Sequence, residues 1–413
     1  MRAVRFDVSA RGFVLARTLG RISDAPLYGG LSALALGEVD LPDLPGGRWV
    51  RLRVVSCGIC GTDISSIGYA LSPSIEPFSS FPAVLGHEIL AIVEEVGPDV
   101  TRVGPGQRVA VDPMIACTVR GFASPCPSCS TGRHGTCEMA GEDGEVRVGE
   151  HALSPGLTIG YHRDLPGGWG EAVLAHEDQL FPVPEGLDDR AAVLTEPLSI
   201  GMHAVLNCRP LTTDRVLVIG SGPIALGTIW ALRATGFEGA IVAQIKRRHE
   251  AELATLFGAS DVIQPGDPAR SALVDTGARA YMPIIGDEVF AGGGFPLIFD
   301  CVGSRATLAQ ALGFASPRGT VVMLGCAAEI PKLDLTAVWS RELKLEGFVG
   351  YGVEDWKGGR RHTFEITHEL MVETGAPLDR MVTHVYPLDE FRDGVRAAAN
   401  RRKSGAVKVV LVP

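Results

Sequence analysis

The sequence predicts an α/β protein of two units, one rich in β-strands and one built on a doubly wound parallel sheet. Three observations predict this class. The chain has 413 residues, which exceeds the size at which a single hydrophobic core usually stops growing. Its first ~200 residues carry short strand-like segments between Gly and Pro residues. After Cys208, by contrast, apolar strands alternate with helical segments.

The strand-like segments of the first part lie in its first 114 residues. Residues 49–56 (WVRLRVVS) alternate partly between apolar and polar side chains, as a half-buried strand does. Residues 83–100 and 106–114 are apolar runs bounded by Gly and Pro. Many short strands joined by turns predict an all-β or barrel-like unit.

The second part opens with a continuous apolar strand at 215–220 and a helix that ends at Gly236. The alternation then continues through strands and helices at 239–245, 247–259, 261–263, 296–304, 306–315, 319–325 and 343–350. Such alternation predicts a parallel sheet with helices on both faces. Beyond Gly350 we expect two amphipathic helices and a final strand, at 361–374, 388–405 and 406–413.

Composition excludes several classes of partner. The formal net charge is -10, and the basic residues are scattered apart from one short run, so a nucleic-acid partner is not expected. The apolar stretch 216–232 is slightly short for a bilayer and contains a glycine turn, so we expect no membrane span. The N-terminus lacks an apolar segment of signal-peptide length, which predicts a cytoplasmic protein.

A glycine motif predicts a dinucleotide site in the second part. The sequence GSGPIALG follows one strand and opens a helix. Gly220 permits the tight turn, Gly222 lets the backbone approach a pyrophosphate, and Ala225 stands where a third glycine often lies. The free N–H groups at the helix N-terminus favour phosphate. The alternative is a glycine turn that only packs helix on strand.

The end of the next strand bears on the choice of cofactor. An acidic residue that binds the ribose hydroxyl is common there, but this chain has Gln244 and Ile245, followed by Lys246, Arg247 and Arg248. No carboxylate repels a 2′-phosphate, and these cations could bind one. NADP is therefore expected over NAD, with a solvated basic surface as the alternative.

Cysteine usage predicts metal binding. The chain has nine cysteines, of which Cys117, Cys126, Cys129 and Cys137 lie in one loop rich in Gly, Ser and Pro. Four thiolates suit a closed structural zinc site. In the alternative, the insertion 118–125 separates Cys117 from the others and leaves the site empty or three-coordinate.

A second group of candidate ligands is spread over the first part. Cys57 and Cys60 lie in SCGICGTD, His87 and Glu88 lie in GHE, and Glu196 lies just before the nucleotide-binding unit. A single buried His is more often a core residue. Here it adjoins a carboxylate, and a cysteine follows a strand earlier in the chain, so a ligand cluster is credible. Glu196 is a candidate because ligand sites form at domain junctions.

Together these features resemble the zinc-dependent medium-chain dehydrogenase/reductase family over nearly the whole chain. The resemblance is carried by CGICGTD, GHE, the cysteine loop, GGWGEAV, TEPLSIG, VLVIGSGPIALG, FDCVGS and the terminal KVVL. TEPLSIG is similar to the polyol, sugar and threonine dehydrogenase branch. The resemblance implies a GroES-like catalytic domain over 1–200, a Rossmann NAD(P)-binding domain over 201–346, and a return to the catalytic domain over 347–413.

The resemblance also implies roles for single residues. Cys60 and His87 would bind a catalytic zinc, with Glu88 and Glu196 competing for the third position and Cys57 a small buried neighbour. Thr62 would carry the hydroxyl proton, and Asp63 would orient the ligand histidine. Ile224 would pack behind the nicotinamide, and Lys408 would touch the pyrophosphate. The remaining implied cofactor contacts are Pro223, Cys301, Val302, Gly303 and Leu324.

The implied activity is oxidation of a secondary alcohol by NAD(P) in a homodimer or homotetramer, the substrate being a polyol, sugar, cyclitol or amino alcohol. A zinc-independent enone or quinone reductase and a non-catalytic nucleotide-binding protein are the alternatives. The chain departs from the family pattern at Ser65, where many relatives have a histidine that relays protons. The segment 138–166 also looks long, which we expect to reshape the substrate entrance. Trp169 either lines the pocket or packs in the core.

Overall fold

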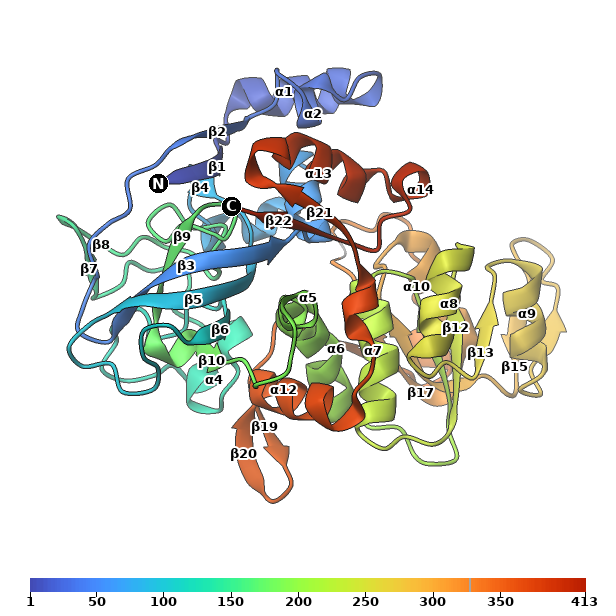
Figure 1. Ribbon diagram of the computed structural model, residues 1–413. Helices are drawn as coiled ribbons and strands as arrows, with labels where there is room; N and C mark the ends of the chain where they lie inside the picture. The colour runs from blue at the N-terminus through green and yellow to red at the C-terminus, as the bar shows by residue number, and fades with distance from the viewer. Residues whose placement is uncertain (327) are drawn as a thin grey trace. The chain divides into compact units, whose positions relative to one another are not determined.

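The computed structural model describes residues 1–326 and 328–413. The chain forms two compact units, one comprising residues 1–196 and 350–413 and the other residues 197–349 (Figure 1). The first unit is therefore discontinuous in sequence. Each unit has its own hydrophobic core.

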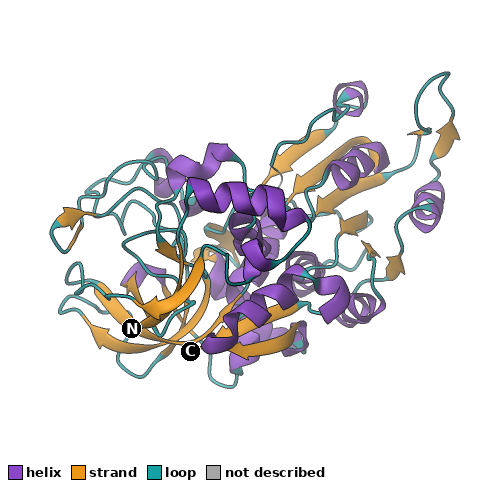
Figure 2. Ribbon diagram, turned by 90° about the horizontal axis from the view of Figure 1, so that it is seen from above, coloured by secondary structure: helices purple, strands orange, loops and turns teal. Residues whose placement is uncertain are grey.

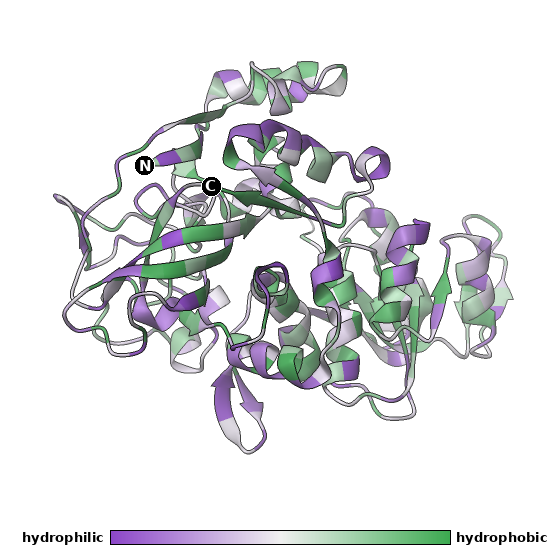
Figure 3. Cartoon of the chain, in the orientation of Figure 1, coloured by the Kyte–Doolittle hydropathy of each residue, from purple (hydrophilic) through white to green (hydrophobic). Residues whose placement is uncertain are grey.

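The first unit is built on a seven-stranded sheet in which six strands follow the order β10-β6-β5-β3-β22-β21 and β9 also pairs with β3. A three-stranded sheet, β2-β1-β4, accompanies it. Strands β3 and β5 are mostly hydrophobic (Figure 3), as strands facing a core must be. The strands are β1 (Arg2–Phe6), β2 (Leu34–Glu38), β3 (Trp49–Gly58), β4 (Ala83–Val84), β5 (Glu88–Val96), β6 (Arg108–Val111), β9 (Ala172–His176), β10 (Leu180–Pro182), β21 (Val382–Pro387) and β22 (Lys408–Val412).

Helices of this unit are mostly short. The N-terminal excursion, the segment between β1 and β2, forms two helices that were not expected, α1 (Ala10–Thr18) and α2 (Ala25–Tyr28). The guanidinium of Arg392 ties the end of this excursion to the unit by bonding to backbone carbonyls, including that of Leu34. The others are α3 (Gly61–Ile67), α4 (Pro127–Ser130), α5 (Asp189–Ala192), α12 (Thr363–Thr374), α13 (Phe391–Ala399) and α14 (Arg401–Ser404).

Two features of the C-terminal part differ from the sequence prediction. The helix expected over 388–405 is divided into α13 and α14, because Asn400 leaves the helical region at φ -105° and ψ 45°. A hairpin of β19 (Val353–Trp356) and β20 (Gly359–His362) precedes α12. It turns at Lys357 and Gly358, which both have positive φ. Such turns usually contain Asn-Gly, so this one gave no clear signal.

The second unit contains the predicted parallel sheet, with strand order β13-β12-β11-β16-β17-β18. Helices lie beside these strands in Figure 2. The strands are β11 (Arg215–Ile219), β12 (Ala240–Gln244), β13 (Asp261–Ile263), β16 (Phe295–Asp300), β17 (Ala315–Met323) and β18 (Lys344–Gly347). The helices are α6 (Thr195–Asn207), which begins at the unit boundary, α7 (Pro223–Ala234), α8 (Arg248–Leu256), α9 (Asp267–Val274), α10 (Arg305–Phe314) and α11 (Thr336–Ser340).

Smaller elements complete the two units. A hairpin of β14 (Arg279–Tyr281) and β15 (Val289–Ala291) extends the second unit, and β7 (Arg147–Val148) pairs with β8 (His151–Ala152) in the first. The apolar stretch 216–232 divides into β11 and α7. Within the described residues we find no helix that combines the length and apolar character needed to cross a membrane.

Candidate functional site

The first candidate metal site forms where two antiparallel strands bring distant segments together. Gly58 at the end of β3 pairs with Glu88 at the start of β5. Cys60 follows β3 as the N-cap of α3, and His87 directly precedes β5. The register therefore places these side chains side by side, and ligand atoms of Cys60, His87 and Glu88 lie within 4.8 Å of one another.

Residues at the N-terminus of α3 hold Cys60 and His87 in position. The backbone N–H of Cys60 donates to Asp63 Oδ2 at 2.9 Å, and Thr62 Oγ1 lies 3.1 Å from Cys60 Sγ. Asp63 Oδ1 lies 3.6 Å from His87 Nδ1. Burial alone would lower the pKa of His87, but Asp63 and Cys60 outweigh it and raise that pKa well above its ordinary value.

This donor set fits zinc. A thiolate, an imidazole and a carboxylate are common zinc ligands. His87 and Glu88 are buried, whereas Cys60 is half-buried. Among the described residues, His87 Nδ1 has no hydrogen-bond partner, whereas the buried nitrogens of a core histidine are usually bonded.

Glu88 and Lys408 form a buried ion pair. The Lys408 ammonium lies 2.5 Å and 2.6 Å from the two Glu88 oxygens, and the residues are only 3% and 1% exposed. Burial lowers the pKa of Lys408, but Glu88 outweighs this effect and raises it. Lys408 was expected to contact a cofactor pyrophosphate. The structure instead places its ammonium inside the first unit, where it neutralises Glu88.

Glu196 lies near this group but outside it. Among the described residues, the cluster around Cys60 contains Glu88 and not Glu196. The hydroxyl of Tyr351 donates to Glu196 Oε1 at 3.1 Å. Burial, against the opposing charge of His87, raises the pKa of Glu196 to about 7. Tyr351 has no sequence signal, because its partner lies 155 residues away.

Two residues whose roles the sequence did not settle, Cys57 and Trp169, lie in the core. Cys57 is fully buried, as the expected small neighbour of Cys60 should be. Trp169 is also fully buried, and its indole N–H points to Gly58 O at 3.4 Å. The structure therefore supports packing over pocket lining for Trp169.

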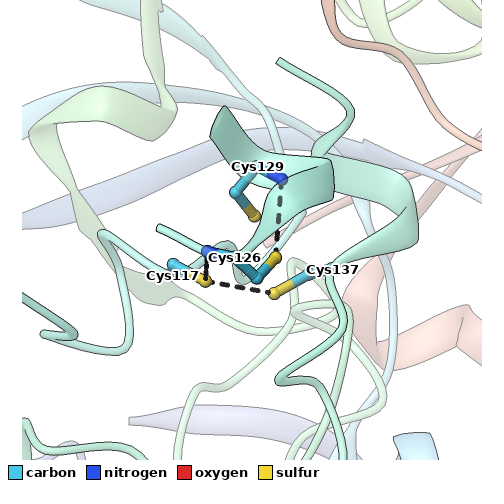
Figure 4. A group of neighbouring side chains, drawn as sticks. All are labelled: Cys117, Cys126, Cys129 and Cys137. Atoms are coloured by element: carbon cyan, nitrogen blue, oxygen red, sulfur yellow. Dashed lines mark hydrogen bonds between the residues drawn. The ribbon is translucent and has the colours of Figure 1, made fainter. Parts of the chain in front are cut away.

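The four cysteines of the loop form a second candidate metal site. Their side chains point toward one another (Figure 4), and all four sulfurs lie within 4.8 Å of one another. Cys117 is fully buried and its sulfur lies 3.7 Å from that of Cys137, so the insertion has not removed it from the group.

The thiol chemistry of this loop also fits zinc. Cys117, Cys126, Cys129 and Cys137 are free thiols, not disulfides. Backbone N–H groups point at sulfur, from Cys126 to Cys117 at 3.3 Å and from Glu138 to Cys126 at 3.4 Å. Hydrogen bonding by Cys129 lowers the pKa of Cys137 to about 5, whereas burial raises the pKa of Cys117 to about 11 and the bond with Cys137 raises the pKa of Cys129. The contacts that lower a thiol pKa stabilise thiolate, the form that binds metal.

A third group of potential ligands, Asp112, His134 and His362, does not fit a metal. His362 Nδ1 accepts the backbone N–H of Phe364 at 3.2 Å as the N-cap of α12. His362 Nε2 lies 3.2 Å from Asp112 Oδ2, and among the described residues it makes no hydrogen bond. A ligating histidine donates from its other nitrogen, and His362 Nδ1 accepts instead, so we assign no metal to this group.

The glycine motif of the second unit has the geometry of a phosphate-binding turn. Gly220 follows β11 with φ +135°, and Gly222 is the N-cap of α7, which begins at Pro223. A Cβ at Gly220 would approach Cys301 and Val302 to 3.3 Å. The α7 N-terminus, with Ile224 in its first turn, can therefore meet an anion through backbone N–H groups.

The other predicted cofactor contacts lie at the same edge of the sheet. Cys301, Val302 and Gly303 follow β16, and Leu324 follows β17. Asp300 Oδ1 accepts the N–H groups of Val302 and Gly303 at 3.0 Å and 3.2 Å, which holds this loop in place. Ligands of doubly wound sheets bind at the carboxyl ends of the strands.

The three cations after β12 differ in their surroundings. Arg247 lies 2.5 Å from the buried carboxylate of Glu250, and Arg248 is 94% exposed beside Glu252. Lys246 is exposed. Gln244 is buried and bonds to Gln310 at 3.0 Å, so it does not replace the missing acid. Among the described residues, Lys246 is therefore the one of these three cations without a carboxylate partner.

Comparisons with known proteins agree with both units. The alcohol dehydrogenase GroES-like domain matches residues 46–185, and the zinc-binding dehydrogenase family matches residues 223–364. L-galactonate-5-dehydrogenase of Escherichia coli K12 is 28% identical over 83% of this chain and 86% of its own length. Sorbitol dehydrogenase of Arabidopsis thaliana is 27% identical over 92% and 93%.

Solved structures are similar over the whole chain. A protein of Sinorhizobium meliloti 1021, described as a zinc-binding dehydrogenase bound to NADP, is 26% identical, with a TM-score of 0.71 over 100% of this chain and 99% of that one. A protein of Escherichia coli CFT073, described as a short chain alcohol dehydrogenase with NADH, is 22% identical, with a TM-score of 0.72 over 100% and 99%. The second likeness shows the fold alone.

A GroES-like unit with two groups of zinc-type ligands and a Rossmann unit with a phosphate-binding turn define a zinc-binding dehydrogenase. The chain belongs to the zinc-dependent, alcohol dehydrogenase-like family of medium-chain dehydrogenases. It is an oxidoreductase that uses zinc and a nicotinamide cofactor. The predicted fold class and family are thereby confirmed.

Proposed function

We propose that this chain catalyses the reversible oxidation of a secondary alcohol to a ketone, with a polyol, sugar, cyclitol or amino alcohol as substrate. The observation that carries the proposal is the convergence of Cys60, His87 and Glu88 beside Thr62. The relatives support the substrate class, because one is named for L-galactonate and another for sorbitol.

Cys60 and His87 would hold the catalytic zinc, with Glu88 or Glu196 as the third protein ligand. Bound zinc would supply a Lewis acid that lowers the pKa of the alcohol, and the nicotinamide would accept the hydride. The four loop cysteines would hold a structural zinc. The Rossmann unit would bind the dinucleotide through its glycine turn.

The chain's own groups account for proton handling and orientation. Thr62 Oγ1, 3.1 Å from Cys60 Sγ, is placed to accept a hydrogen bond from a hydroxyl bound next to that sulfur and to relay its proton to water. Asp63 faces His87 and holds the backbone at Cys60, so it orients both ligands. The Lys408 ammonium lies against the buried Glu88 carboxylate and compensates its charge.

The cofactor proposal is NADP over NAD. It is supported by the uncharged Gln244 at the end of β12, by the exposed Lys246, and by the NADP bound in one similar structure. We also propose a cytoplasmic homodimer or homotetramer, as the family resemblance implies.

The direct test is a panel of polyols, sugars, cyclitols and amino alcohols assayed with NADP and with NAD, using wild-type protein and two matched cysteine variants. Cys60→Ala should abolish oxidation of every substrate found, because it removes a ligand, while dinucleotide binding remains. Cys57→Ala should retain activity, since Cys57 is a buried neighbour outside the ligand group. Equal activity of the two variants would refute the assignment.

A further inference from the structure

Tyr161 connects the long loop of the first unit to the candidate zinc site. Its hydroxyl donates to Asp63 Oδ1 at 2.7 Å, the same oxygen that lies 3.6 Å from His87 Nδ1. Its ring packs on the His87 imidazole with centroids 5.4 Å apart and a tilt of 42°. Tyr161 therefore reaches His87 both directly and through Asp63.

Both oxygens of the Asp63 carboxylate accept a hydrogen bond. Oδ2 accepts the N–H of Cys60 at 2.9 Å, and Oδ1 accepts the Tyr161 hydroxyl. The carboxylate is fully buried, so no solvent replaces a lost donor. Without the hydroxyl, Oδ1 would retain only the long approach to His87, and the carboxylate could rotate about its last torsion.

The loop that carries Tyr161 is itself anchored. Arg120 is fully buried, and its guanidinium donates to backbone carbonyls of the segment 138–156, including that of Glu142 at 2.9 Å. The carbonyl of Tyr161 accepts the N–H of Ser80 at 2.9 Å. These contacts hold the backbone of the segment that carries Tyr161.

We infer that Tyr161 is a positioning residue of the catalytic zinc site, which holds Asp63 in the orientation that supports His87. This inference rests on the proposed function. It also gives the long segment 138–166 a role at the metal site, in addition to the expected role at the substrate entrance.

The test measures zinc affinity in the Tyr161→Phe variant, which keeps the ring and removes only the hydroxyl. Competition with a chromophoric chelator should show about 10- to 100-fold weaker binding of one zinc. The zinc of the four cysteines should keep its affinity and so reports that the fold is intact. Cobalt placed in the weaker site should show a changed visible absorption spectrum. Tyr69→Phe is the matched control, because Tyr69 also lies beside α3 but bonds to the backbone N–H of Ser9.

A double-mutant cycle separates positioning through Asp63 from general packing. Tyr161→Phe should weaken zinc binding in the wild-type background and have no further effect in an Asp63→Asn background. Wild-type affinity in Tyr161→Phe, or equal losses in both backgrounds, would overturn the inference. If the wild-type chain binds only the zinc of the four cysteines, the proposed function itself fails, which is a different result.

Discussion

At the scale of single residues, the two buried carboxylates of the candidate zinc site differ in the charge of their neighbours. Glu88 is buried with Lys408 as its counter-ion, whereas Glu196 is buried with the neutral hydroxyl of Tyr351. An unpaired buried carboxylate is costly in its ionised form, which is why the pKa of Glu196 rises to about 7. The two carboxylates that compete for the third zinc position thus differ in charge compensation.

Lys246 carries the prediction on cofactor choice. Lys246→Ala should lower kcat/KM for NADP about tenfold, which corresponds to ~1.4 kcal/mol, because a phosphate loses a charged donor. The value for NAD should hardly change. Steady-state kinetics with both cofactors measure the ratio of kcat/KM for NADP to kcat/KM for NAD.

Arg248→Ala is the control for this prediction, because it removes a neighbouring cation that is 94% exposed beside Glu252. A Lys246 variant that keeps the wild-type preference between NADP and NAD would contradict the role. Arg247 is a poorer probe, since its removal would also leave Glu250 buried without this cation.

At the scale of elements, the register of β3 and β5 builds the site. A shift of one residue in their pairing would turn every side chain of one strand to the opposite face. The core positions Cys57 and Ile89, paired across the two strands, oppose such a shift, because both are buried. The proposed ligands Cys60 and His87 lie just beyond this pair, so core packing also positions the candidate metal site.

A second element-scale feature is the carboxylate of Glu177, which joins two loops of the first unit. It lies in the turn Glu177–Gln179 and accepts the N–H groups of Thr101 at 2.8 Å and Arg102 at 3.0 Å, and the Nε–H of Arg48 at 2.8 Å. These donors outweigh the effect of burial, which alone would raise the pKa of Glu177, and they lower it to about 2.

Glu177→Gln should therefore lower the free energy of unfolding of the first unit by about 2 kcal/mol at pH 7. Because the folded pKa of about 2 is below the ordinary 4.5, the stabilisation is complete above pH 4.5 and is lost as the pH falls toward 2. Denaturant unfolding measures the free energy of unfolding of both proteins, and the difference between them should be smaller near pH 3 than at pH 7.

The exposed Glu185 offers the control for this measurement. Glu185→Gln should leave stability within about 0.5 kcal/mol of wild type at either pH. A difference between Glu177→Gln and wild type that stays constant from pH 7 to pH 3 would contradict the account of the Glu177 carboxylate.

At the scale of the whole molecule, local motifs predicted most of the fold and some of the site. The parallel sheet was predictable because each strand and helix has its own hydrophobic pattern and turn residues. The cysteine loop was predictable because its four ligands fall between residues 117 and 137. Cys60 and His87 lie in short recognisable motifs, so they too could be named from the sequence.

The contacts that single-sequence reasoning missed join distant segments. Tyr161 is 98 residues from Asp63, and Lys408 is 320 residues from Glu88. Tyr161 has no local pattern that distinguishes it from other tyrosines, and the terminal KVVL motif drew attention to Lys408 but not to its partner. Their partners depend on how the chain folds back into the first unit, and that information lies in tertiary packing.

The most direct test of the central claim is the zinc content of purified protein, measured by elemental analysis on wild type and on two cysteine variants. Wild type should contain two zinc ions per chain, Cys57→Ala should also contain two, and Cys60→Ala should contain one. This pattern would show that Cys60 belongs to a metal site separate from the four-cysteine group. A single zinc in wild type, or two zincs in Cys60→Ala, would contradict the account.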